Sequence, residues 1–209
     1  QIIAMAKEKG IPIVKTERQA LDRIGGGASH QGVAAYVSAY AYAQMDDILA
    51  KAQSAGEEPF VIILDGLEDP HNLGAIMRTA ECAGAHGIII PKRNSCGLTE
   101  TVAKTSAGAI EYMPCVKVSN IVRTIDELKT MGFWIAACDM GGQEYYRTDL
   151  RGKLAVVIGG EGNGISRLVK EACDFTVSMP MKGKITSLNA SNAAAVLMYE
   201  VRRQRDGER

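Results

Sequence analysis

The chain has 209 residues, of which 46% are hydrophobic and 23% are charged. At roughly 150 residues per domain, this length allows one large domain or two small ones. The 24 basic and 24 acidic side chains balance, so net charge gives no argument for a nucleic-acid or membrane partner. No apolar run approaches the ~20 residues that span a bilayer, and the first residues show no signal-peptide pattern.

Cysteine and histidine positions argue against two kinds of site. Five cysteines are widely spaced without a CxxC pair, and three of them lie in apolar surroundings. This pattern favours reduced core thiols in a cytoplasmic protein over a disulfide framework. The three histidines have no ligand-like spacing, which predicts that no metal is bound.

The first 60 residues change composition twice. The run GGGASHQG predicts a flexible loop, a short strand is expected over 33–37, and an acidic helix follows that ends before Gly56. We therefore expect a boundary near residue 38, with domains at 1–38 and 39–209. The first segment is too short to fold alone and the chain lacks an initiator Met. The chain is therefore expected to be a fragment or a processed form, and its first segment is expected to be the end of a longer domain with a linker.

Apolar strands and helices alternate from Phe60 onward. Nearly continuous runs of Val, Ile and Leu predict six strands, at 60–64, 87–90, 115–118, 133–138, 154–159 and 175–179. Helical patterns lie between and after them, at 73–83, 99–109, 119–131, 164–173 and 190–204. Such alternation predicts an α/β fold, a mostly parallel sheet sandwiched by helices. A ligand is expected at the carboxyl ends of the strands.

The first unusual stretch, DPHNLGAIMRTA (69–80), follows a predicted strand and leads into a helix. Asn72 is expected at the N-cap of this helix, and Gly74 leaves room for close approach. Arg78, expected on the second turn, is placed to bind a phosphate. A capped helix with a solvated arginine would explain the same residues.

The second stretch, GGEGNGIS (159–166), has four glycines in six residues. This density indicates positive φ angles or backbone pressed against a neighbour. The spacing does not match GxGxxG, and no Gly-Lys-Ser/Thr follows. These mismatches weigh against an oxidoreductase with a bound dinucleotide, which is one alternative class of enzyme.

The third stretch, SLNASNAAA (187–195), places two serines and two asparagines at the start of the last helix. One N-cap residue would suffice there, and the extra hydroxyls and amides can bind a polar ligand at the helix N-terminus. A well-capped helix that packs through its three alanines is the plain structural explanation.

In this order and on this strand pattern, the three stretches resemble the motifs of the TrmH/SpoU RNA 2′-O-ribose methyltransferases of the SPOUT superfamily. The resemblance covers about residues 30–205, and HQGVAAYV (30–37) is similar to the large-subunit rRNA guanosine 2′-O-methyltransferase branch. It implies a deep C-terminal trefoil knot, formed by the glycine loop and residues 177–191, in a homodimer with RNA across its interface. Residues before 30 would end the truncated N-terminal RNA-binding domain of that branch.

The resemblance implies S-adenosylmethionine as the cofactor, held mainly by backbone groups at Gly159, Gly160, Met179, Met181 and Leu188. Arg78 would act on the ribose 2′-OH and the adjacent phosphate. A guanidinium stays protonated, so a phosphate clamp or a relay through the phosphate is chemically easier than a simple base. Asn72 would orient the substrate, Ser187 and Asn189 would hold substrate and cofactor, and Glu161 would tie the glycine loop to the dimer.

Basic residues elsewhere are candidates for contact with RNA phosphates, although each is also an ordinary surface charge. They are Lys92, Arg93, Lys182, Lys184, Arg202, Arg203 and Arg205. One departure from the family pattern is Asn192, which stands where an apolar residue is usual and is expected to add a polar group to a packed helix.

The activity implied is S-adenosylmethionine-dependent 2′-O-methylation of a ribose, with guanosine in large-subunit rRNA preferred and tRNA second. The alternative from another class is a knotted homologue that binds RNA without catalysis. All the polar residues of the motifs are present, which weighs against that alternative.

Overall fold

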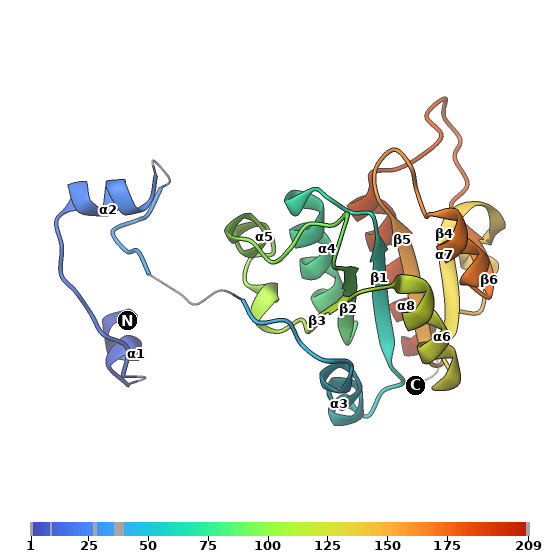
Figure 1. Cartoon of the computed structure of the whole chain (residues 1–209), viewed down its shortest axis with the longest axis horizontal. Coiled ribbons are helices and arrows are strands. Elements are labelled where there is room, and N and C mark those ends of the chain that lie inside the picture. The colour runs from blue at the N-terminus through green and yellow to red at the C-terminus, as the bar shows by residue number, and fades with distance from the viewer. Residues whose placement is uncertain (1, 9, 27–28, 36–39, 208–209) are drawn as a thin grey trace. The chain divides into compact units, whose positions relative to one another are not determined.

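The structure, a computed structural model, describes residues 2–8, 10–26, 29–35 and 40–207 (Figure 1). The chain divides into two units, residues 1–39 and 40–209. The expected boundary near residue 38 lies outside the described residues, and the two-domain division stays a prediction.

The N-terminal unit contains α1 (Ile2–Glu8) and α2 (Arg18–Ile24). Neither helix has a buried residue. A side-chain contact within this unit pairs His30 Nε2 with Asp22 Oδ1 at 2.9 Å. Of the strand expected over 33–37, residues 33–35 are not in a strand, and residues 36–37 lie outside the described residues.

The second unit is built on one six-stranded sheet in the order β3-β2-β1-β5-β4-β6. Every neighbouring pair is parallel, which confirms the predicted α/β fold. The strands are β1 (Phe60–Asp65), β2 (Gly87–Pro91), β3 (Cys115–Val118), β4 (Trp134–Glu144), β5 (Leu154–Gly159) and β6 (Phe175–Ser178). β1 and β5 lie at the centre, and their register pairs Asp65 with Gly159 at the carboxyl edge.

Helices cover both faces of this sheet (Figure 1). They are α3 (Met45–Ala55), α4 (Pro70–Cys82), α5 (Glu100–Thr105), α6 (Ile121–Thr130), α7 (Arg167–Ala172) and α8 (Ala190–Asp206), with short 3-10 turns η1 (Ala109–Glu111) and η2 (Tyr145–Arg147). Alternate residues of β1 enter two cores, because side chains of a strand point to opposite faces. Phe60, Ile62 and Leu64 pack with α4 and α8, whereas Val61 and Ile63 pack with α3, α6 and α7.

Several predicted helices differ in their ends, and for two of them the cause is local. Asp69 is the N-cap of α4, and its carboxylate accepts the His71 backbone N–H at 3.0 Å. Asn72 therefore lies inside the first turn, and its assignment as N-cap was wrong. The helix expected over 99–109 ends at Thr105, because Ala107 and Gly108 adopt φ angles of +50° and +91°.

The segment before α3 lies along the edge strand β3. The Ala43 N–H donates to Cys115 O at 2.9 Å and forms a parallel bridge with Val116. The Tyr42 hydroxyl accepts the Leu98 N–H at 3.0 Å and lies 3.3 Å from Lys117 Nζ. The start of the second unit is thereby fixed to the sheet.

The structure also shows the state of the cysteine thiols and the character of the helices. All five cysteines are free, and burial raises the pKa of the Cys115 thiol to about 12 and that of Cys138 to about 11. Over the described ranges, the helices are too short or too polar to cross a bilayer.

Candidate active site

Loops from β1, β5 and β6 meet at the carboxyl edge of the sheet, where the three sequence stretches come together. The glycine loop after β5 is held against the loop after β1. Gly160 N donates to Asp65 O at 2.8 Å, and Asp65 Oδ2 accepts the Ser166 N–H at 2.7 Å. Asp65 thus fixes both ends of the glycine loop.

Two glycines of this loop are required by close backbone contact. A Cβ on Gly159 would lie 2.2 Å from the carbonyl carbon of Gly164, and one on Gly160 would lie 2.0 Å from Gly66 O. These positions have no room for any side chain. Gly162 and Gly164, with φ of +87° and +63°, provide the left-handed turns that fold the loop back.

Glu161 joins the first and third stretches. Its Oε1 accepts Asn72 Nδ2 at 2.7 Å and Asn189 Nδ2 at 2.8 Å. Asn189 is the N-cap of α8, and its Oδ1 accepts both the backbone N–H and the hydroxyl of Ser191. Those two bonds turn the Asn189 amide nitrogen toward Glu161. The structure therefore brings together one predicted residue from each stretch.

A cavity of about 590 Å³ opens beside this cluster, between the middle of β4 and the loops after β5 and β6. All five residues predicted to hold the cofactor line it: Gly159, Gly160, Met179, Met181 and Leu188. Ser187, Asn189 and Glu161 line it as well. Apolar side chains with exposed backbone and a few polar groups at the rim suit a nucleoside-sized ligand.

Arg78 lies apart from this cavity. It is on the third turn of α4 rather than the second, and it is exposed. It lines neither the 590 Å³ cavity nor a second cavity at the carboxyl edge of the sheet. Within the described part of the chain its guanidinium has no hydrogen bond or ion pair. The structure does not join Arg78 to the other predicted residues of its own chain.

The remaining predicted basic residues divide into two groups. Lys92, Arg93, Lys182 and Lys184 are exposed near the carboxyl edge of the sheet. The arginines at the end of α8 instead make protein contacts. Arg202 pairs with Asp206 and Glu57, Arg203 with Glu200, and Arg205 donates to the carbonyls of Glu58, Pro59 and Gly152. Arg205 is half-buried and its guanidinium is held by backbone carbonyls, so it is not the free surface charge expected, and its contact with RNA phosphates is disfavoured.

Asn192 also differs from expectation. It is exposed on α8, so it does not place a polar group inside the packed face of the helix.

Comparison with known families accounts for both parts of the chain. The SpoU rRNA Methylase family matches residues 59–199, and the family "RNA 2'-O ribose methyltransferase substrate binding" matches residues 1–43. The first match spans the sheet, the glycine loop and most of α8. The chain belongs to the SpoU rRNA methylase family.

Relatives of this SpoU chain support the same membership. YacO of Bacillus subtilis (strain 168), assigned by name to the TrmH family of tRNA/rRNA methyltransferases, is 54% identical over 99% of this chain and 83% of its own length. A Staphylococcus aureus (strain MSSA476) protein named for the same family is 48% identical over 98% of this chain and 83% of its length.

Solved structures share the fold. The SpoU methyltransferase AviRb from Streptomyces viridochromogenes, in complex with the cofactor AdoMet, has a TM-score of 0.72 and 29% identity. The match covers 79% of this chain and 63% of AviRb. An AdoMet-bound rRNA methyltransferase from Sinorhizobium meliloti has a TM-score of 0.77 over 97% of this chain and 76% of its own, at 22% identity, and so shows likeness of fold.

Sequence reasoning missed several residues of the SpoU site. Asp65 holds the glycine loop, and Asp139, on the wall of the 590 Å³ cavity, pairs with Lys170 at 2.6 Å. Both aspartates directly follow a buried apolar run at the carboxyl edge, and that position was the available signal. Asn163 lines the same cavity from within the glycine loop.

Proposed function

We propose that this chain transfers the methyl group of S-adenosylmethionine to a ribose 2′-hydroxyl of RNA. One observation carries the proposal: Glu161, which lines a cavity together with Asn189 and all five predicted cofactor residues, accepts the amides of both Asn72 and Asn189 on its Oε1. Three separate stretches of the sequence thus build one site, as a methyl transfer between two bound molecules requires.

The residues present fit the cofactor. Gly159 and Gly160 have no room for side chains, and their bare backbone can contact an adenosine closely. Met179, Met181 and Leu188 supply apolar walls. When bound, S-adenosylmethionine supplies an electrophilic methyl group on a sulfonium.

The polar residues then have separate tasks. Asn72 and Asn189 are oriented by Glu161, and Ser187 on the same wall can hydrogen-bond the substrate. Arg78 binds the phosphate next to the reacting ribose and stabilises the developing alkoxide, since a guanidinium does not serve as a base near neutral pH. Because Arg78 lines neither cavity of its own chain, it reaches the site of a second subunit in a homodimer.

The preferred substrate is a guanosine in large-subunit rRNA, with tRNA as the second candidate. The match of residues 1–43 to a substrate-binding family supports a role of the N-terminal unit in RNA binding. The trefoil knot, the homodimer and a cytoplasmic location stay predictions.

The test is methyl transfer from labelled S-adenosylmethionine into unmodified rRNA and, separately, tRNA, followed by nuclease mapping of 2′-O-methyl nucleotides. Label at one guanosine ribose of rRNA is the expected result. Label on a base instead of a ribose would overturn the proposed chemistry. Cofactor binding without transfer to either RNA would favour the non-catalytic alternative.

A further inference from the structure

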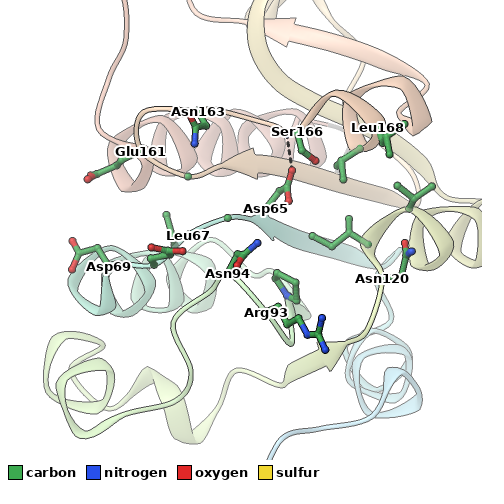
Figure 2. Close-up of a pocket in the computed structure, with 18 residues that line it drawn as sticks. Asp65, Leu67, Asp69, Arg93, Asn94, Asn120, Glu161, Asn163, Ser166 and Leu168 are labelled. Carbon is green, nitrogen blue, oxygen red and sulfur yellow. Dashed lines mark hydrogen bonds between the residues drawn. The ribbon is translucent and has the colours of Figure 1, made fainter.

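A second cavity, of about 720 Å³, lies at the carboxyl edge on the other side of the glycine loop (Figure 2). It is bounded by the loops after β1, β2 and β5 and by the starts of α6 and α7. After β1 the chain turns through α4 to β2, and after β5 it turns through α7 to β6, on the opposite face. This crevice between β1 and β5 is the topological switch point where open α/β sheets bind ligands.

The cofactor proposal leaves this crevice unused. Of the five cofactor residues, Gly160 alone lines it. The two cavities share Gly160, Glu161, Asn163 and Gly164, so the glycine loop is the wall between them. A molecule in the second cavity would therefore lie beside the reacting groups.

The charges of the lining select the kind of ligand. Asp65, Glu68, Asp69 and Glu161 contribute four carboxylates, against the single guanidinium of Arg93. This excess of negative charge disfavours a phosphate and favours a ligand with N–H donors. Within the described residues, no group of three or more His, Cys, Asp or Glu side chains could hold a metal ion, so the carboxylates are not a cation site.

The unused hydrogen-bonding groups of the cavity lining favour a ligand with a flat polar ring. Asp65 lies between the walls, and its Oδ1 makes no hydrogen bond within the described part of the chain, while Oδ2 accepts the Ser166 N–H. The amides of Asn94 and Asn163 face the cavity from opposite walls (Figure 2), and neither has a side-chain partner in the described ranges. Asn94 has a φ of +55°, a left-handed conformation that asparagine adopts more readily than most residues.

Apolar side chains supply the faces for such a ring. Pro91 and Val122 are half-buried in the cavity wall, and Leu168 is 59% exposed at its lip. Apolar faces combined with carboxylate and amide acceptors suit an unstacked nucleobase, whose edge is read by hydrogen bonds.

We infer that this cavity receives a base of the substrate RNA next to the methylated ribose, and that it selects guanine. The guanine Watson–Crick edge offers adjacent N1–H and N2–H donors, which a carboxylate and an amide oxygen accept together. The inference rests on the proposed function and adds the residues that choose the substrate: Asp65, Asn94 and Asn163 are positioned to read the base.

The direct test is a titration of the ¹⁵N-labelled chain, saturated with S-adenosylhomocysteine, with guanosine, inosine or uridine. Guanosine should shift the backbone amide signals of Gly66 and Asn94, and leave that of Met181 in the cofactor cavity unchanged. Inosine, which lacks the exocyclic amino group, should bind about tenfold more weakly. Equal binding of uridine and guanosine, or shifts confined to the cofactor cavity, would overturn the inference.

Two variants make the test specific. Asn94→Gly removes the amide and keeps a residue that adopts positive φ freely, and Asp65→Asn removes the charge and keeps an acceptor for Ser166. Each should raise the KM for RNA about tenfold, and Asn94→Gly, which lies outside the cofactor cavity, should do so without changing the Kd for S-adenosylmethionine. Asp126→Asn, on the exposed face of α6, is the matched control and should change neither constant.

The outcomes separate the two proposals. Methyl transfer into RNA with unchanged KM in both variants would overturn the base pocket and leave the proposed function intact. Failure of the wild-type chain to methylate RNA would overturn the proposed function, and the guanosine titration would still decide whether the cavity binds a base.

Discussion

At the scale of single residues, one carboxylate oxygen orders the candidate active site. Asn72 is 89 residues and Asn189 is 28 residues from Glu161 in the chain, yet both amides donate to Glu161 Oε1. Glu161 is itself exposed, so these charge-assisted bonds cost little desolvation. Their effect is to link the buried amide of Asn72 to Asn189 and Glu161, which line the cavity.

His86 predicts how stability depends on pH. It is 2% exposed, and its Nδ1 accepts the Phe60 N–H at 3.0 Å. Burial, with a smaller contribution from nearby Arg205, lowers the pKa of His86 from 6.5 to about 4. Between these values the unfolded chain binds a proton that the folded chain does not. The free energy of unfolding should therefore fall as pH falls from about 6.5 to about 4, by about 3 kcal/mol.

The measurement is urea unfolding, followed by circular dichroism at several pH values, of the wild-type chain and of His86→Asn. Asparagine keeps an acceptor for Phe60 and does not titrate. The wild-type chain should lose more stability on acidification than the variant. Parallel losses in the two proteins would show that His86 is not the group responsible.

Some residue-level predictions succeeded because the signal was local. The density of glycines in 159–164 indicated close backbone contact, and the structure shows it at Gly159 and Gly160. The misplaced N-cap had a local signal too, because an aspartate before a proline is a typical helix start. The pairing of Asn72 with Glu161 had none, since it depends on how distant loops meet. The binding of Arg205 to backbone carbonyls just before β1 and β5 had no local signal either.

At the scale of elements, strands were predicted better than helices. The expected strands at 115–118 and 154–159 match β3 and β5 residue for residue, because buried parallel strands read as continuous apolar runs. Helix ends were less certain. α7 starts at Arg167, three residues later than expected, since the glycine loop occupies the positions before it.

The contact between the loops after β1 and β5 predicts the effect of one methyl group. In Gly160→Ala, the Cβ would overlap Gly66 O, and the two loops would be forced apart. We expect a loss of about 2–3 kcal/mol in stability and weaker cofactor binding, measured by thermal unfolding and by calorimetry with S-adenosylhomocysteine. Gly183→Ala is the matched control, because its nearest neighbour would be Ile185 N at 4.0 Å. Equal effects of the two substitutions would contradict this account.

At the scale of the whole molecule, the proposed role of Arg78 requires a second chain. The cavity, Ser187, Asn189 and Glu161 lie together, whereas Arg78 lies on an exposed part of α4 away from them. Single-chain reasoning from the sequence could not separate these cases, because a motif gives the identity of a residue and not the subunit in which it acts.

Mixing two inactive variants tests the proposed assembly. Arg78→Ala should bind S-adenosylhomocysteine normally but transfer no methyl group, and Asn189→Ala should also be inactive. Co-expressed with different affinity tags and purified as heterodimers, the two should recover about half of the wild-type activity, because one of the two sites is then intact. A heterodimer without activity, or a chain that stays monomeric, would contradict action of Arg78 across the interface.

The contacts of Arg205 also constrain when this fold can form during synthesis. β1 is made early, but its partner β5 follows about ninety residues later, and the carbonyls of Glu58 and Pro59 wait for a guanidinium 146 to 147 residues further along the chain. Until β5 has been made, one edge of the central strand has no partner. Folding of the second unit is completed only once α8 has been made.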